Sequence, residues 1–267
     1  MTNILDKLKH FCYRQVPDAR QMEPRFFMKI FRKDFVNTLR LDMVDFLAAQ
    51  KIQEETFKSY KNCNAGKDLV IVAPGPTLNK YKPIPDALHL GLNRALFRED
   101  IHFDYLFMQD YIAVKDYINE LGQERFKDTD KFFGIIRDYT YDGKATIPES
   151  VALRLGAKRY CIFNQWKSFE SNFPTDIAFA PFATAASVAG SAIQFALYTN
   201  PKRIYLVGCD CSNVYFNENN KNAKTSNDVL KAWINCKKFA EIYYPETEII
   251  SVNPVGLKGL FKDIYME

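Results

Sequence analysis

The stretch that most constrains the fold is residues 68–79, with the sequence DLVIVAPGPTLN. Four apolar residues at 69–72 are followed by a turn rich in Pro and Gly, and then by a hydroxyl and an amide at Thr77 and Asn79. A short apolar run bounded by turn residues is typical of a strand that is buried on both faces of a parallel sheet. Because Pro and Gly cannot continue a strand ladder, this strand is predicted to end at about Ala73. Its carboxyl end either binds a ligand, as strand ends in open parallel sheets do, or is an ordinary turn.

Downstream of this strand, short apolar runs alternate with stretches of helical periodicity. The alternation favours an α/β fold, with a single Rossmann-like, mostly parallel sheet and helices on both faces. The predicted strands cover residues 68–73, 87–92, 104–108, 131–136, 159–163, 203–208 and 248–252. The predicted helices cover residues 94–98, 112–122, 149–155, 186–199, 227–243 and 256–264.

The first 62 residues are predicted to form an N-terminal helical extension, and residues 63–267 the Rossmann-like nucleotide-binding domain. Apolar residues recur near helical spacing through residues 3–12 and 23–60. The first 40 residues hold nine Lys and Arg against four Asp and Glu, so the basic character of this chain of net charge +4 is local to that end. The basic helices either pack on the sheet with a solvated outer face or make peripheral contact with an anionic membrane.

Composition excludes several classes of protein. The net charge is too small to indicate a nucleic-acid partner. The sequence has neither an apolar run near the roughly 20 residues that span a bilayer nor the apolar core of a signal peptide. We therefore expect a cytoplasmic protein, with a peripheral place at the inner membrane face left open. The six Cys form no CxxC pair and no metal-like group with His, so reduced thiols and no metal site are expected.

Small and polar residues follow four of the predicted strands at the point where each one ends. They are Gly75-Pro76-Thr77, Gly91-Leu92-Asn93-Arg94, Gln109-Asp110 and Gly208-Cys209-Asp210. A polar residue after a single strand is usually only a helix cap. Four such ends on parallel strands would line one edge of the sheet, where an amide can bind a base or a sugar with both a donor and an acceptor. Ser187 is a fifth candidate, either as an anion site at a helix start or simply as an N-cap.

Other patterns narrow the alternatives. No GxGxxG follows the first strand and no GxxxxGK[ST] occurs, so the dinucleotide fingerprint and the P-loop are both missing. The acidic pair in residues 128–130 precedes a strand and is interpreted as a solvated turn. His89 lies inside a predicted strand and is interpreted as a satisfied core side chain. The polar, Asn-rich residues 213–228 are typical of a lid loop beside a strand end.

The order of five stretches resembles a known family. They are APGPTL at 73–78, GLNR at 91–94, ATAASVAGSAIQFAL at 183–197, KRIYLVGCD at 202–210 and SVNPVGLKGLF at 251–261. Their arrangement is similar to that of the compact bacterial lipooligosaccharide sialyltransferases. It also resembles the related Rossmann proteins that are grouped with 6-hydroxymethylpterin pyrophosphokinases and flagellin-modification proteins.

The resemblance implies a pocket for a nucleotide-sugar donor, with cytidine monophosphate as the nucleotide. It also implies that no metal or other cofactor is needed, because the family stabilises the departing phosphate with two lid tyrosines. The substrate-binding residues that it implies are Gly75, Pro76, Thr77, Asn93, Arg94, Gln109, Ser187, Gly208, Asp210 and Asn253.

The chain departs from this family at the catalytic positions. The family takes its general base from a lid His, but this chain has no His after His102. Ser212 stands at the first lid tyrosine position, so Tyr215 remains as the partner of the leaving phosphate. Asp110 is the leading candidate for the base because it follows a strand, ahead of Glu218 and Asp228. Asp110 and Tyr215 are therefore the expected catalytic residues.

The leading hypothesis is a nucleotide-sugar-dependent, sialyltransferase-like glycosyltransferase of surface polysaccharide or lipooligosaccharide assembly. Its partners would be a nucleotide sugar and a glycan acceptor, and homo-oligomerisation is left open. A second hypothesis is a Mg²⁺-dependent pyrophosphokinase or phosphotransferase, in which Asp110 and Asp210 hold the metal. A third is a catalytically inactive nucleotide-binding protein, suggested by the missing lid His.

Overall fold

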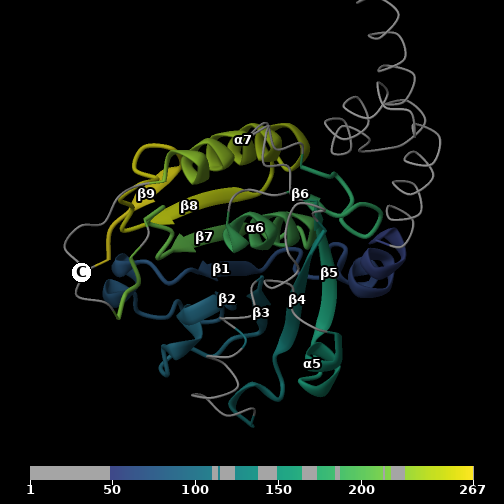
Figure 1. The fold of residues 1–267 in the computed structure, drawn as a ribbon. Coiled ribbons are helices and arrows are strands. Elements are labelled where there is room, and N and C mark those ends of the chain that lie inside the picture. Colours follow the sequence, from purple (N-terminus) through teal and green to yellow (C-terminus); the bar gives the residue numbers. More distant parts are fainter. Residues whose placement is uncertain are drawn as a thin grey trace, which may run out of the picture.

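A computed structural model describes residues 49–109, 114, 124–137, 149–163, 173–183, 187–212, 214–217 and 226–266. Within them the chain forms one nine-stranded sheet in which every pair of neighbouring strands is parallel (Figure 1). The expected α/β fold with a single Rossmann-like sheet is confirmed.

The order of the strands explains where a ligand site can form. The described strands are β1 (Asp68–Val72), β2 (Leu88–Leu92), β3 (Tyr105–Met108), β4 (Asp130–Arg137), β5 (Lys158–Phe163), β6 (Phe182–Ala183), β7 (Arg203–Val207), β8 (Glu248–Val252) and β9 (Lys262–Ile264). They lie in the order β6-β5-β4-β3-β2-β1-β7-β8-β9. The chain therefore builds outward from β1 to β6 and returns to the other side of β1 for β7. In open parallel sheets, ligands bind at the carboxyl ends of the strands beside such a reversal.

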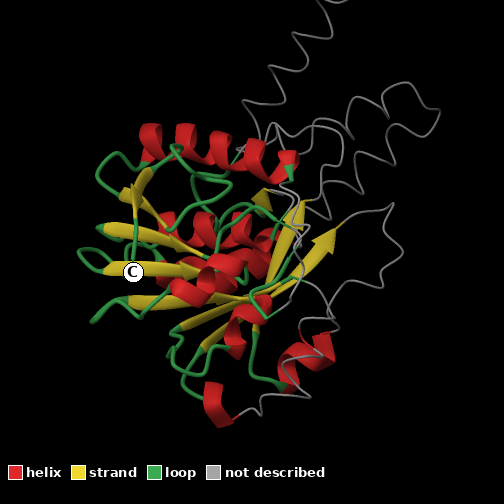
Figure 2. Cartoon of the chain, turned by 90° about the vertical axis from the view of Figure 1, so that its left-hand side faces the viewer, coloured by secondary structure: helices red, strands yellow, loops and turns green. Residues whose placement is uncertain are grey.

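Helices cover the sheet, as Figure 2 shows. The α-helices with described bounds are α5 (Glu149–Arg154), α6 (Val188–Tyr198) and α7 (Asn227–Tyr243). Short 3₁₀ helices are η2 (Lys58–Tyr60), η3 (Pro76–Lys80), η4 (Asn93–Phe97) and η5 (Glu124–Phe126). Thus η3 and η4 begin directly after β1 and β2. Of the described residues, no helix is long and apolar enough to cross a membrane.

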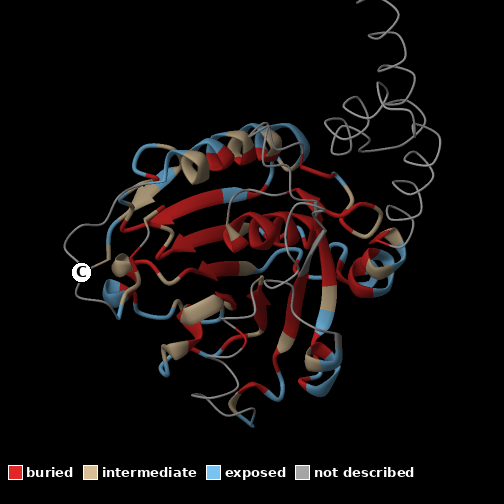
Figure 3. Cartoon of the chain, in the orientation of Figure 1, coloured by how far each residue is buried: buried red, intermediate tan, exposed pale blue. Residues whose placement is uncertain are grey.

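Two apolar cores lie on the two faces of the sheet. Figure 3 shows that most of the sheet and helix α6 are buried. Because side chains alternate along a strand, Leu69 and Ile71 of β1 point to one core, and Val70 and Val72 point to the other. Residues of α6 and α7 contribute to the first core, and residues of η3, η4 and α5 to the second. This is why β1 is an apolar run without alternation in its sequence.

Helix α6 is buried along its entire length. It packs on β1, β2, β3 and β6, and its small residues Ala189, Gly190, Ser191 and Ala192 allow a close approach. Its one large polar side chain, Gln194, is satisfied by backbone groups: its Oε1 accepts from Ala183 N at 3.0 Å, and its Nε2 donates to Gly190 O at 2.6 Å. The burial of α6 holds its first residue against the carboxyl side of the sheet.

The described part of the predicted N-terminal extension packs into the core. Residues 49–57 are helical. Phe57 is fully buried, with ring centroids 5.4 Å from Phe132, 5.2 Å from Phe182 and 5.9 Å from Phe195. Residues 1–48, on which the membrane-contact prediction rests, lie outside the described residues, and the domain boundary near residue 62 stays a prediction.

The structure corrects the secondary-structure prediction at the C-terminus. Residues 256–264 were expected to be helical but form turns followed by strand β9. Gly259 has a φ of 74°, which lies in the left-handed region and outside the range of an α-helix. Asn253 N donates to Ile264 O at 2.9 Å, which draws this segment into the sheet beside β8. The short edge strand β6 was not predicted, and the expected helix at 112–122 lies outside the described residues except for Val114.

Candidate functional site

The ends of β1 and β7 are joined by backbone hydrogen bonds beyond their last residues. Ala73 N donates to Val207 O at 2.8 Å, and Gly75 N donates to Gly208 O at 3.0 Å. A Cβ on Gly75 would lie 2.3 Å from Gly208 O, and a Cβ on Gly208 would lie 2.0 Å from Ala73 O. Both positions therefore need glycine for the close approach of the two backbones, and Gly208 also has a left-handed φ of 65°.

Asp210 closes the turn that follows β1. Its Oδ2 accepts from Thr77 N at 2.8 Å, and its Oδ1 accepts from Thr77 Oγ1 at 2.5 Å. The side chain is buried, and this burial raises the pKa of the Asp210 carboxyl, while the two hydrogen bonds from Thr77 act in the opposite direction. A metal ion on Asp210 would compete with both bonds, so this contact does not favour the role that the phosphotransferase hypothesis gives to Asp210.

A short described segment of the predicted lid, residues 214–217, crosses the end of β1. Phe216 N donates to Pro74 O at 2.8 Å, and Asn79 Nδ2 donates to Phe216 O at 2.8 Å. Beside them, the guanidinium of Arg94 lies 5.0 Å from the centre of the Tyr215 ring. These contacts bring Arg94 and Tyr215, both predicted site residues, to the same edge as Pro74 and Asn79.

Two amide side chains at the neighbouring ends of β2 and β3 have buried oxygens without a hydrogen-bond partner among the described residues. They are Oδ1 of Asn93 and Oε1 of Gln109. Asn93 follows Leu92, which pairs with Phe107, and Gln109 comes two residues after Phe107. The two amides therefore follow the ends of adjacent strands, at the same edge of the sheet. Each oxygen is an acceptor that lacks a donor, and burial of such an atom is costly unless a ligand supplies the donor.

Two other buried amides among the described residues, Gln53 and Gln194, have their oxygens and nitrogens satisfied by backbone groups. Oε1 of Gln53 accepts from Cys161 N at 2.7 Å, and Oε1 of Gln194 accepts from Ala183 N at 3.0 Å. Asn64, at the opposite edge of the sheet, also leaves its Nδ2 unpaired, so one unpaired amide atom is not a site. Two unpaired oxygens on adjacent strand ends, beside a chain reversal, are a stronger indication.

Asn93 also has a backbone role that the sequence pattern did not indicate. Its φ is 44°, in the left-handed region that Asn tolerates better than most residues. This conformation turns the chain from β2 directly into η4. The presence of Asn at position 93 therefore has two explanations, the left-handed backbone and the unpaired amide, which substitution by glycine can distinguish.

The observed hydrogen bonds of Ser187 and Asn253 are structural and do not involve the other candidate site residues. Ser187 is the N-cap of α6, and its side chain accepts from Ala189 N at 3.2 Å. Asn253 follows β8, and its Oδ1 accepts from Met266 N at 2.9 Å, although its Nδ2 is unpaired among the described residues. The observed contacts thus fit the capping interpretation of Ser187 and a role for Asn253 in holding the C-terminal strand. Their places in the site remain predictions.

The remaining candidates divide into residues that the structure describes and residues that it does not. Asp110, Glu218 and most of the predicted lid lie outside the described residues. His89 is a satisfied core side chain, as predicted: its Nε2 lies 2.8 Å from Tyr81 Oη, and burial lowers its pKa. The solvated turn expected at residues 128–130 is confirmed at Asp128, which is exposed, but Thr129 is buried, with its hydroxyl donating to Phe103 O at 2.7 Å, and Asp130 begins β4. The described residues contain no cluster of three or more His, Cys, Asp or Glu that could hold a metal ion.

Comparison with known proteins finds only distant similarity. No family model matches the chain, and no curated protein matches it. The MAf glycosyltransferase from Magnetospirillum magneticum AMB-1 is similar in structure, with a TM-score of 0.42 and 14% identity over 82% of this chain. This chain covers only 38% of that protein.

A second similar structure is the sialyltransferase CstII from Campylobacter jejuni, solved in complex with a substrate analogue, CMP-3FNeuAc. Its TM-score is 0.40 and its identity 15%, over 74% of this chain and 85% of that chain. Both of these proteins are glycosyltransferases, and at this level of similarity the function of the present chain has to be argued from its own residues.

Proposed function

We propose that the protein is a nucleotide-sugar-dependent glycosyltransferase whose donor binds over the carboxyl ends of β1, β2 and β3. The observation that carries the proposal is the pair of unpaired, buried oxygens on Asn93 and Gln109. Two unpaired acceptors at one edge of the sheet suit neutral groups that carry donors, such as the hydroxyls of a sugar or the amino group of a base. Arg94, at the same edge, supplies the positive charge that a phosphate needs.

The proposed reaction transfers a sugar from the nucleotide phosphate to an acceptor hydroxyl. The acceptor oxygen forms a bond to the anomeric carbon, the bond from that carbon to the phosphate oxygen breaks, and a base takes the proton of the hydroxyl. We propose Asp110 as that base and the hydroxyl of Tyr215 as a donor to the leaving phosphate, with Arg94 balancing its charge. The hydroxyl of Thr77 donates to Asp210, so we assign Thr77 to holding the turn after β1, and its contact with the donor stays a prediction.

The proposed donor class is a sugar linked to cytidine monophosphate, and the proposed acceptor is a surface polysaccharide or lipooligosaccharide. The basic residues of the first 40 positions would then favour an anionic membrane surface, where such acceptors are assembled. Catalysis without a metal is part of the proposal, and a Mg²⁺ requirement for binding would favour the phosphotransferase hypothesis instead.

The test is isothermal titration of CMP and of CMP-, UDP- and GDP-linked sugars into the full chain, with and without Mg²⁺. We expect one nucleotide class to bind, and to bind about tenfold more weakly to Asn93→Gly, since each lost hydrogen bond to a buried acceptor is worth about 1 kcal/mol or more. Glycine keeps the left-handed backbone and removes only the amide. Asn200→Gly is the matched control, because Asn200 also has a left-handed φ, of 57°, but lies exposed before β7.

The outcomes separate the hypotheses. Binding that is weakened in Asn93→Gly but not in Asn200→Gly supports the amide as a ligand contact. Equal binding by both variants would mean that Asn93 serves only through its left-handed backbone, and it would remove the main support for the proposed site. Binding without transfer to any glycan acceptor favours a catalytically inactive nucleotide-binding protein, and the absence of binding by any of these ligands contradicts the proposal.

A further inference from the structure

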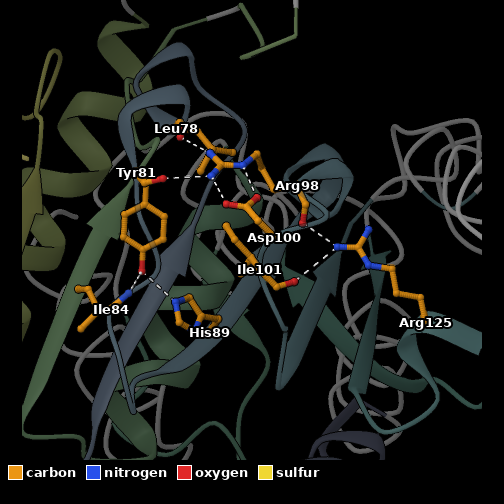
Figure 4. A network of polar contacts seen from close by, with 8 residues as sticks. All are labelled: Leu78, Tyr81, Ile84, His89, Arg98, Asp100, Ile101 and Arg125. Atoms are coloured by element: carbon orange, nitrogen blue, oxygen red, sulfur yellow. Dashed lines mark hydrogen bonds and ion pairs between the residues drawn. The ribbon is translucent and has the colours of Figure 1, made fainter. Parts of the chain in front are cut away.

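One arginine connects the loop after β2 to the loop after β1. Arg98 follows η4, and its guanidinium donates to the carbonyl oxygen of Leu78 and, at 3.0 Å, to that of Tyr81 (Figure 4). Asp100 orients this guanidinium from the other side, with its carboxylate 2.7 Å from Nε and 2.6 Å from Nη2. The Arg98 side chain is 16% exposed and that of Asp100 53%, so the bonds to the two carbonyl oxygens are better shielded from water than the ion pair is.

The residues that Arg98 holds lie at the centre of the site. Leu78 stands between Thr77, which binds Asp210, and Asn79, which binds the backbone of Phe216. A displacement of the Leu78 peptide would therefore disturb both the contact of Thr77 with Asp210 and the contact of Asn79 with Phe216. Arg98 itself makes none of these contacts, so it can act on the site only through the η3 backbone.

We propose that Arg98 is a positioning residue for the carboxyl-edge site, which keeps η3 in the place where Thr77 and Asn79 meet their partners. Arginine suits this task because its planar fork reaches two carbonyl oxygens and a carboxylate at the same time. Lysine keeps the charge but has a single nitrogen, which cannot reproduce the fork. The part of this inference that concerns ligand affinity rests on the proposed function, and the part that concerns the loop does not.

The chain provides a matched control in Arg125. Its guanidinium also binds backbone carbonyl oxygens, those of Leu96 at 3.0 Å, Arg98 at 2.6 Å and Ile101 at 3.4 Å. Figure 4 shows its bonds to Arg98 and Ile101. It therefore stabilises the loop after η4, but within the described residues none of its hydrogen bonds reaches η3. Arg98→Lys and Arg125→Lys change the same chemistry in neighbouring places.

The first experiment measures amide hydrogen exchange at Thr77, whose N–H donates to Asp210. We expect exchange about tenfold faster in Arg98→Lys than in the wild type, the equivalent of weakening one charge-assisted hydrogen bond. We expect little change at Thr77 in Arg125→Lys. Asp100→Asn is the second variant, which keeps Arg98 and removes only its orienting carboxylate, and it decides the matter if Arg98→Lys does not fold.

The second experiment titrates CMP into the same three variants. We expect affinity about tenfold lower in Arg98→Lys, a smaller loss in Asp100→Asn, and wild-type affinity in Arg125→Lys. Unchanged exchange at Thr77 in both Arg98→Lys and Asp100→Asn overturns the inference. If the wild type does not bind CMP, the proposed donor class fails, and faster exchange at Thr77 still establishes the positioning of the loop. If Arg125→Lys accelerates exchange at Thr77 and lowers CMP affinity as much as Arg98→Lys does, the effect is general loosening and the positioning role is wrong.

Discussion

Thr77 donates both its amide N–H and its hydroxyl to one carboxylate, that of Asp210, from a position more than a hundred residues away in the chain. This pair ties the turn after β1 to the turn after β7. It lies at the reversal of the sheet, so the geometry of the candidate site depends on it.

The carboxylate of Asp210 is expected to make stability depend on pH. Burial raises its pKa in the folded protein, so the folded chain holds this proton more tightly than the unfolded chain does. The contribution of Asp210 to the unfolding free energy is therefore largest below the ordinary carboxyl pKa of about 3.9. It decreases as pH rises through the raised pKa of the folded protein and is constant above that pKa. Urea unfolding of the wild type and of Asp210→Asn over this window measures the difference.

The same substitution also tests the hydrogen bonds. An amide at this position offers one oxygen in place of two, so one of the two donors of Thr77 loses its acceptor, at a cost of about 1–3 kcal/mol. Thr77→Val removes only the hydroxyl and should cost less. Equal pH dependence in the wild type and in Asp210→Asn would contradict the assignment of the slope to this carboxyl.

Gly75→Ala is expected to destabilise the protein by about 3 kcal/mol or more, because the new Cβ would lie 2.3 Å from Gly208 O and neither backbone can yield cheaply. Gly66→Ala is the control: nothing lies within 4 Å of its Cβ, and only the left-handed φ of 79° opposes the change. We expect a loss of about 1–2 kcal/mol there. Thermal unfolding compares the two, and a similar loss in both variants would contradict the steric explanation.

Tyr215→Phe separates the two roles that this residue could have. Phenylalanine keeps the ring that lies under the Arg94 guanidinium and removes the hydroxyl. If the hydroxyl stabilises the leaving phosphate, we expect kcat to fall by about a hundredfold with little change in donor affinity. Steady-state kinetics with the donor found by titration measures this, and an unchanged kcat would leave only the stacking role.

Phe57→Ala tests how far the fold depends on the part of the chain before β1. Phe57 is fully buried between Phe132, Phe182 and Phe195, and its truncation is expected to cost about 3–5 kcal/mol. Leu153→Ala, at a side chain 70% exposed, should change the unfolding free energy by less than about 0.5 kcal/mol. Chemical denaturation of both variants is the measurement. A small loss in Phe57→Ala would mean that this segment is dispensable for the core.

Residues 69–72 and 204–207 show that local sequence predicts buried strands well. A strand buried on both faces needs apolar residues at every position, and the Pro and Gly that follow β1 end the strand. These two strands and their parallel arrangement could therefore be predicted from the sequence. The helix predicted at 256–264 was wrong because its apolar residues belong to an edge strand, and pairing with β8 is a long-range contact that periodicity does not contain.

The candidate site divides in the same way. The residue types at the strand ends were visible in the sequence, because an amide or a glycine after an apolar run is a local signal. Their partners were not: Thr77 binds Asp210, Asn79 binds Phe216 and Arg98 binds Leu78 across turns that only the folded sheet brings together. The sequence by itself determined the parallel sheet, apart from its edge strands β6 and β9, and the edge at which we propose that a ligand binds. The tertiary structure decided which polar groups at that edge are used by the protein and which remain open for a ligand, because hydrogen-bond partners distant in the chain are chosen by packing.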